Sequence, residues 1–227
     1  MPAKKKKFRL FDAVLASVCI ILTVESAAPA AAVGNSQYFW WISMLILFFV
    51  PYGLISAELG TTYLGEGGIY DWVRLAYGNK WGCRIAWNYW INVALWIASL
   101  AVLFNDTLTQ ITGWDLPVWA SIAIQLAFIW VVILMGKGKI SESKWLINTA
   151  AVFKVFIMLL IGGLGIWVAA TRGMATQFTF RSLFPSMDLS SLSFVSIIIY
   201  NFVGFEIVTT LASDMEKPKK QIPQALL

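Results

Sequence analysis

Long apolar stretches alternate with short polar stretches along the whole chain. Six apolar stretches have about the length that a helix needs to cross a lipid bilayer, roughly 20 residues. They cover residues 10–33, 39–64, 82–103, 116–135, 146–170 and 192–212. The pattern therefore predicts an all-α integral membrane protein with six transmembrane helices.

The connections between these stretches are short, and one of them has a helical pattern of its own. Within residues 65–82, Ile69, Trp72, Val73 and Ala76 recur at the spacing of one helix face. We expect a short amphipathic helix at the membrane surface there. The polar segment 137–149 is typical of a solvated helical loop. The first apolar stretch is too long for the apolar region of a signal peptide.

Composition supports a membrane protein and excludes most enzyme classes. Of the 227 residues, 59% are hydrophobic and 13% are charged, whereas soluble domains carry about 25% charged residues. The mean hydropathy is +0.73. Histidine is absent, and Cys19 and Cys83 have no metal-binding or disulfide spacing. We therefore expect no metal and no cofactor, and we predict that the protein is not an enzyme.

The positive charges lie on one side of a six-span arrangement. Fourteen of the 17 lysines and arginines fall before the first span, after the last span, in the second and fourth connections or, for Arg84, at the start of the third span. An excess of cations marks the cytoplasmic side of membrane proteins. Both ends of the chain are therefore predicted to be cytoplasmic, in a multi-pass protein of the cell membrane. The lysine run 4–7 reads as a topology signal that touches anionic headgroups, with no nucleic-acid partner.

Three ionisable residues lie deep inside apolar stretches: Glu25, Lys154 and Glu206. Charges at mid-bilayer are costly, and such residues usually face the interior of the bundle and mark a substrate or ion pathway. The alternative is a structural pair between Lys154 and one carboxylate. Asn88 and Asn92 share a face of the third span, where they either line a pathway or hold helices together.

The first and sixth spans contain residues that interrupt helices. Pro29 follows small and polar residues in the first span, and Gly204 lies in the middle of the sixth span. Interrupted spans at corresponding positions of two internal repeats indicate a transporter binding site. Spans one and six correspond if the repeat has five helices. Free amides at such a break attract an anion, and free carbonyls attract a cation.

Two sequence motifs resemble those of a known family. FVGFE at 202–206, followed by EKPKKQIP at 216–223, is similar to the sixth-span signature of the amino acid–polyamine–organocation transporters. In that family Asn usually occupies the place of Lys217. PYGLISAE at 51–58 and GEGGIYDWV at 65–73 resemble the second span and first cytoplasmic loop of the glutamate/GABA antiporter branch. The resemblance covers essentially the whole chain.

This resemblance implies a leucine-transporter-type fold of two inverted five-helix repeats that works by alternating access. Residues 1–189 would form the cytoplasmic N-terminus and first repeat, and residues 190–227 the start of the second, so that the chain is a fragment that does not transport alone. The resemblance places the substrate between the broken spans. The implied substrate-binding residues are Thr23, Glu25, Ser26, Ala27, Tyr200, Asn201, Gly204 and Glu206.

Two further expectations come from the same resemblance. Lys154 matches a lysine that replaces a sodium ion in proton-coupled relatives, which implies proton coupling. Most of the family carries Gly-Ser-Gly in span one, whereas this chain has Leu22, Thr23 and Val24 there. Capture of a substrate carboxylate by span-one amides is therefore less favoured.

We predict a secondary active amino acid transporter that is proton-coupled or an exchanger. A polyamine or amine permease is one alternative, and a transport-dead sensor or structural subunit of the same fold is another. A membrane enzyme is disfavoured because the sequence has no histidine and no metal motif.

Overall fold

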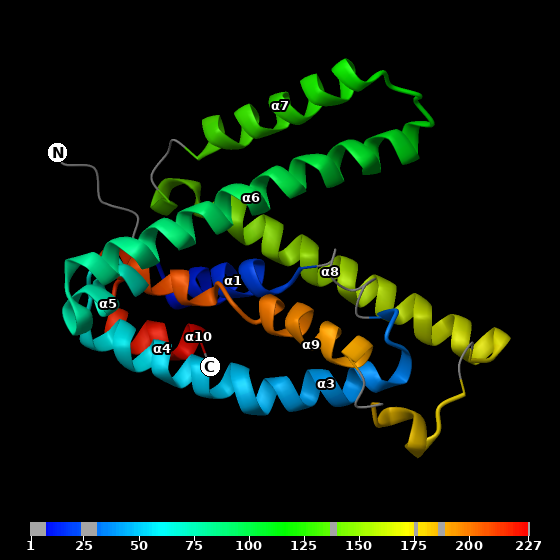
Figure 1. Ribbon diagram of the computed structural model, residues 1–227, viewed down its shortest axis with the longest axis horizontal. Coiled ribbons are helices and arrows are strands. Elements are labelled where there is room, and N and C mark those ends of the chain that lie inside the picture. Colours follow the sequence, from blue (N-terminus) through cyan, green and yellow to red (C-terminus); the bar gives the residue numbers. More distant parts are fainter. Residues whose placement is uncertain (1–7, 24–30, 137–139, 175–176, 186–188, 227) are drawn as a thin grey trace. The chain divides into compact units, whose positions relative to one another are not determined.

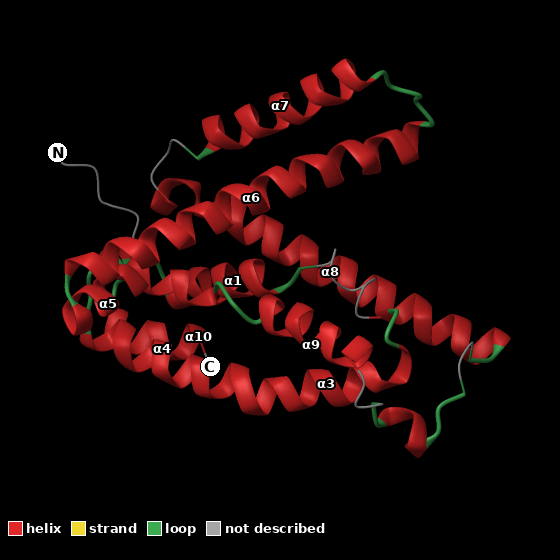
Figure 2. Ribbon diagram, viewed as in Figure 1, coloured by secondary structure: helices red, strands yellow, loops and turns green. Residues whose placement is uncertain are grey.

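The computed structural model describes residues 8–23, 31–136, 140–174, 177–185 and 189–226. Within these residues the regular secondary structure is helical, and one isolated bridge pairs Phe8 with Met215 in parallel (Figure 2). The α-helices are α1 (Leu10–Ile21), α3 (Gln37–Met44), α4 (Val50–Thr62), α5 (Ile69–Tyr77), α6 (Asn79–Thr112), α7 (Val118–Met135), α8 (Ile140–Arg172), α9 (Leu189–Asn201) and α10 (Pro218–Leu226). The 3₁₀-helices are η2 (Gly34–Ser36), η4 (Phe180–Leu183) and η5 (Phe205–Asp214), and η3 (Leu45–Phe49) is a π-helix.

Five helical segments in the described part of the chain are long and apolar enough to cross a membrane. They are Gly34–Thr62, Asn79–Thr112, Val118–Met135, Trp145–Arg172 and Phe194–Asp214. These segments coincide with predicted spans two to six. The first predicted span is shorter as a helix, because α1 ends at Ile21 and the two residues that follow are not helical.

The chain divides into two compact units. The first unit holds residues 1–68 and 144–227, and the second holds residues 69–143. In the first unit α1 and α4 both pack against α10 and η5 (Figure 1). Phe8, Phe205, Val208 and Ile222 are fully buried in the core that these elements share.

Phe8 joins the start of α1 to the segment that follows η5. Its N–H donates to the Asp214 carbonyl at 2.8 Å, and its carbonyl accepts from the Glu216 N–H at 3.3 Å. The Gln221 side chain donates to the same carbonyl at 3.2 Å. The segment before α1 is therefore held against the segment after η5 by backbone bonds as well as by a buried ring.

Aromatic side chains hold α9 against α3 in the same unit. Trp40, Ile198 and Phe202 form a second buried cluster. The Phe202 ring lies 5.3 Å from Trp41 and 5.2 Å from Phe49, measured between centroids. This packing fixes the last turn of α9, where the chain leaves the helix.

The second unit contains α5, α6 and α7. The expected amphipathic helix after the second span is α5, which packs against α6 where Gly82 lies beside Arg74. The Phe104 and Phe128 rings stack at 4.8 Å between α6 and α7. Gly113, with a φ of 68°, ends α6 by donating to the Thr109 carbonyl.

Candidate functional site

The end of α1 leaves helix carbonyls available to partners other than its own backbone. The last carbonyls of a helix have no intrahelical donor and carry partial negative charge. The Leu22 N–H satisfies the Val18 carbonyl at 2.9 Å. The Cys19 carbonyl accepts from Lys154 Nζ of α8 at 2.8 Å. A cationic side chain from α8 thus caps the C-terminal end of α1.

A second helix ends beside the first. The last residue of α9 is Asn201, and Gly204 then adopts a φ of 109° before η5 begins. This left-handed conformation suits glycine and few other residues. The helix interruption that the sequence predicts at Gly204 is therefore present, and the sixth span changes from α to 3₁₀ geometry across it.

One hydrogen bond connects the two interruptions. Thr23 Oγ1 lies 2.9 Å from Asn201 Oδ1, two residues beyond the end of α1 and at the last residue of α9. Asn201 is 7% exposed, and its amide nitrogen Nδ2 has no hydrogen-bond partner. The C-terminal ends of both helices therefore meet at a part-buried polar contact, where Asn201 Nδ2 is a donor without an acceptor.

Glu206 is bound to the backbone of the interruption itself. Its carboxylate accepts from the Gly204 N–H at 2.8 Å, and the residue is 2% exposed. A carboxylate near the first turn of a helix interacts favourably with the amides there. The Gly204 amide is thus already occupied by a negative group of the protein.

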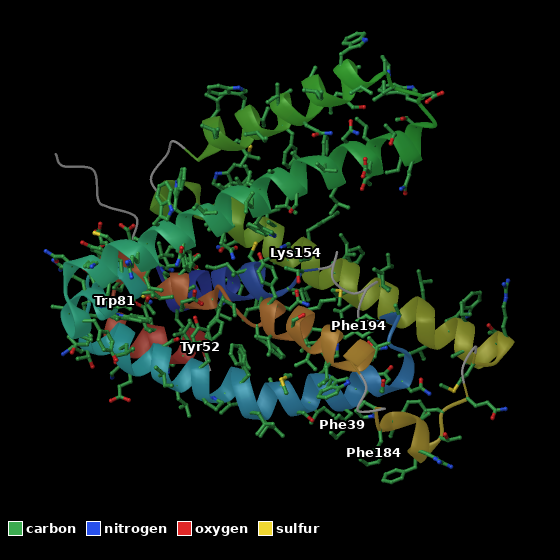
Figure 3. The ribbon with its side chains drawn as sticks, viewed as in Figure 1. Phe39, Tyr52, Trp81, Lys154, Phe184 and Phe194 are labelled. Carbon is green, nitrogen blue, oxygen red and sulfur yellow. The ribbon has the colours of Figure 1, made fainter. Side chains whose placement is uncertain are left out.

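Lys154 is half-buried on α8, and its place among the side chains is labelled in Figure 3. The sequence left open a structural pair between this lysine and a carboxylate. Its hydrogen bond goes to the Cys19 carbonyl, and the ion pair observed in the described residues joins Arg74 to Asp71 at 3.1 Å. Glu25, one of the two candidate carboxylates, lies outside the described residues, so the structural pair stays a prediction.

The remaining site predictions have different outcomes. Glu25, Ser26 and Ala27 lie outside the described residues. Tyr200 is 52% exposed on the last turn of α9. Asn88 and Asn92 are exposed on α6, which belongs to the other unit, so their pathway role stays a prediction. Among the described residues, no cluster of ligand side chains could hold a metal ion.

One buried acid was not predicted as a functional residue. Asp12, which is 5% exposed, accepts from the Arg9 N–H at 2.9 Å and from Asn148 Nδ2 at 2.7 Å. Its spacing from Arg9 is that of an N-terminal capping residue, a signal present in the sequence. The partner on α8 could not be predicted because it is 136 residues away.

Comparison with known proteins gives the family. The family model described as amino acid permease matches residues 8–227. The chain belongs to the amino acid permease family. It is 52% identical, over 98% of its length, to the probable agmatine/putrescine antiporter AguD of Lactococcus lactis subsp. lactis, of which it covers 48%.

More distant relatives of this chain carry different names. The chain is 25% identical to the polyamine transporter RMV1 of Arabidopsis thaliana and 24% identical to the aspartate/glutamate permease AcaP of Lactococcus lactis subsp. cremoris. These matches cover 90% and 82% of the chain, and 40% of each relative. The chain thus spans about half the length of the curated relatives it matches. No solved structure matches it significantly.

Proposed function

We propose that the transporter containing this chain exchanges small cationic amines across the cell membrane by alternating access. The observation that carries the proposal is the Thr23–Asn201 contact, at which the C-terminal ends of α1 and α9 meet. Helix C-termini present carbonyl oxygens and about half a negative charge each. Lys154 occupies the Cys19 carbonyl of one end, and the other carbonyls at the two ends favour an ammonium or guanidinium group.

The same site offers little to a substrate carboxylate. Backbone amides at a break are the usual anion ligands. The Gly204 N–H is taken by Glu206, and residues 22–24 lack the glycines that expose amides in span one of most relatives. An amine without a carboxylate fits these groups better than an amino acid does.

The named relatives support this choice of substrate class. The relative that is 52% identical is a probable agmatine/putrescine antiporter, and RMV1 is a polyamine transporter. Agmatine and putrescine each carry cationic groups at both ends and no carboxylate. We propose exchange of such compounds as the activity.

Amino acid transport is the second candidate, and one observation favours it. Asn201 Nδ2 is a buried donor without an acceptor. A substrate carboxylate would satisfy that donor, and an unsatisfied buried donor costs about 1–3 kcal/mol. Rotation of the amide would instead turn Oδ1 toward a substrate ammonium, because Thr23 Oγ1 can donate or accept.

For the whole transporter we propose the leucine-transporter-type arrangement of two five-helix repeats, with both ends of this chain in the cytoplasm. Lys154 then supplies a fixed positive group at the Cys19 carbonyl, where other transporters would need a bound cation. In this proposal the counter-substrate or a proton, rather than sodium, drives the cycle.

The test is exchange in proteoliposomes of the full-length transporter. Vesicles loaded with putrescine are given labelled agmatine, putrescine, arginine, glutamate or leucine, at two pH values and with or without sodium. Saturable agmatine and putrescine exchange without sodium is the expected result. Exchange of arginine or glutamate in preference to the amines favours the second candidate. Binding of substrate without flux favours the transport-dead alternative.

A further inference from the structure

The sixth span has an unusual geometry after its interruption. Phe205–Asp214 is a 3₁₀-helix of ten residues. Such helices seldom exceed four residues, and longer runs often mark a hinge or strain. The sequence of this segment has no proline or glycine that would prevent an α-helix. Its geometry must therefore be fixed by the surroundings.

Burial along this segment repeats every three residues. Two ridges are buried, and the third row of side chains is more exposed. One ridge consists of Phe205 (0% exposed), Val208 (0%) and Leu211 (8%), and the other of Glu206 (2%), Thr209 (2%) and Ala212 (4%). Side chains three residues apart lie above one another in a 3₁₀-helix, whereas an α-helix would rotate them out of line. The packing around η5 is thus complementary to the 3₁₀ form.

Gly60 on α4 lies against Thr209, the middle residue of the second ridge. A Cβ atom added at Gly60 would lie 2.5 Å from Thr209 Cγ2 and 3.0 Å from Thr209 Cβ. Thr209 cannot easily turn away, because its hydroxyl donates to the Glu206 carbonyl at 2.7 Å. The absence of a side chain at Gly60 therefore allows Thr209 to occupy this place.

A hydrogen bond between the Thr209 hydroxyl and the Glu206 carbonyl links these two residues. These two residues are three apart on one ridge, and Glu206 holds the Gly204 N–H. Between Gly204 and Thr209, a change from 3₁₀ to α geometry would rotate the chain by about 100°. The same change over ten residues would shorten the segment by about 5 Å. The part of the rotation that falls between Gly204 and Glu206 is about 40°, which would turn the Glu206 side chain away from the Gly204 N–H.

We propose that Gly60 and Thr209 are positioning residues for transport. The surface of α4 at Gly60 holds η5 in 3₁₀ register and thereby keeps Glu206 on the amide beside the Thr23–Asn201 contact. This inference rests on the proposed function, because it assigns a role in the cycle to residues that touch no substrate. Departure of Thr209 from Gly60 is then the step that alters the interruption.

The test compares Gly60→Ala, Thr209→Ser and the double variant in the full-length transporter. Gly163→Ala on α8 is the matched control, since a Cβ there meets no atom within 4 Å. Gly60→Ala is expected to lower exchange about fivefold or more, because overpacking a tight contact shifts a two-state equilibrium by at least that factor. Thr209→Ser removes the 2.5 Å contact with Cγ2 and keeps the hydroxyl, so the double variant is expected to recover part of the exchange rate. The contacts at 3.0 Å with Cβ and 3.3 Å with Ile222 Cγ2 remain. Gly163→Ala is expected to match the wild type.

A structural readout separates this inference from the proposed function. Solid-state NMR measures the separation between the carbonyl carbon of Thr209 and the amide nitrogen of Ser213, which is shorter in an α-helix than in a 3₁₀-helix. The spectrum of the Ser213→Ala variant lacks the signal of this pair. Subtracting it from the spectrum of the protein with Ser213 leaves the signal of the Thr209 carbonyl carbon and the Ser213 amide nitrogen. Gly60→Ala is expected to shorten the separation, and Thr209→Ser is expected to restore it in the double variant.

The NMR separations test the positioning contact between Gly60 and Thr209 even if the wild type exchanges none of the compounds tested. In that case the proposed function fails, while a shortened separation in Gly60→Ala still supports the positioning contact. An unchanged separation in Gly60→Ala overturns the inference. Wild-type exchange by Gly60→Ala, or a folded double variant that does not recover, overturns it as well.

Discussion

At the scale of single residues, the two ionisable side chains of the site, Lys154 and Glu206, form hydrogen bonds with backbone groups. Lys154 donates to the Cys19 carbonyl, and Glu206 accepts from the Gly204 N–H. Each charge therefore sits at a helix end of opposite partial charge. Such contacts explain how a costly charge is kept inside an apolar span.

Lys154→Met keeps much of the side-chain length and removes the charge, whereas Lys154→Arg keeps the charge. We expect Lys154→Met to reduce exchange and its pH dependence more than substrate binding, because the Cys19 carbonyl loses its donor at a cost of about 1–3 kcal/mol. Exchange rates at several pH values and equilibrium binding provide the measurement. Lys154→Arg is expected to retain more activity. An unchanged pH profile in Lys154→Met would contradict the coupling role.

Glu206→Gln and Glu206→Ala separate the charge of this residue from its hydrogen bond. Glutamine retains an oxygen that accepts from the Gly204 N–H, so thermal stability is expected to stay near that of the wild type. Amine affinity is expected to fall because the negative charge is lost. Alanine is expected to lower both quantities. If glutamine destabilises the protein as much as alanine does, the carboxylate charge rather than the acceptor holds the interruption.

At the scale of elements, the interruption of the sixth span depends on one glycine. Gly204 has a φ of 109°, and a Cβ there would lie 3.2 Å from Ile20 Cγ2. An L-residue in the left-handed region costs roughly 1–2 kcal/mol, and a β-branched residue also collides with α1. We expect Gly204→Val to abolish exchange while insertion into the membrane is retained.

The measurement is exchange activity together with the amount of folded protein in the membrane. Gly163→Val on α8 serves as the control, because open space surrounds that glycine. Near-normal exchange by Gly204→Val would show that the left-handed interruption is not needed for the transport cycle.

Helix positions were more predictable from sequence than the contacts between helices. Apolar length alone located predicted spans two to six, since membrane thickness sets that length. Gly204 marked the interruption of span six. The 3₁₀ form of η5 could not be predicted, because it depends on Gly60 of another helix. The Lys154 partner is a backbone carbonyl, which leaves no mark in the sequence.

At the scale of the whole molecule, contacts of Phe8 constrain the topology of the membrane protein. Phe8 pairs with Met215 and bonds to Asp214, so the chain before α1 and the chain after η5 lie together. Two segments in direct contact through backbone bonds must lie on the same side of a bilayer. The distribution of lysines and arginines predicts that this side is the cytoplasm.

Cysteine labelling tests this orientation in cells that express the full-length transporter. After Cys19, Cys83 and any cysteine elsewhere in the full-length transporter are replaced by alanine, single cysteines are introduced as Lys219→Cys and Arg172→Cys, both at exposed positions. Lys219 follows the sixth predicted span and Arg172 follows the fifth, so the two positions are expected on opposite sides. A membrane-impermeant maleimide is expected to label Arg172→Cys in intact cells, and Lys219→Cys only after permeabilisation. The reverse labelling pattern would place most of the lysines and arginines outside the cell. That result would contradict the proposed orientation, and it would also contradict the placement of Phe8 on the cytoplasmic side.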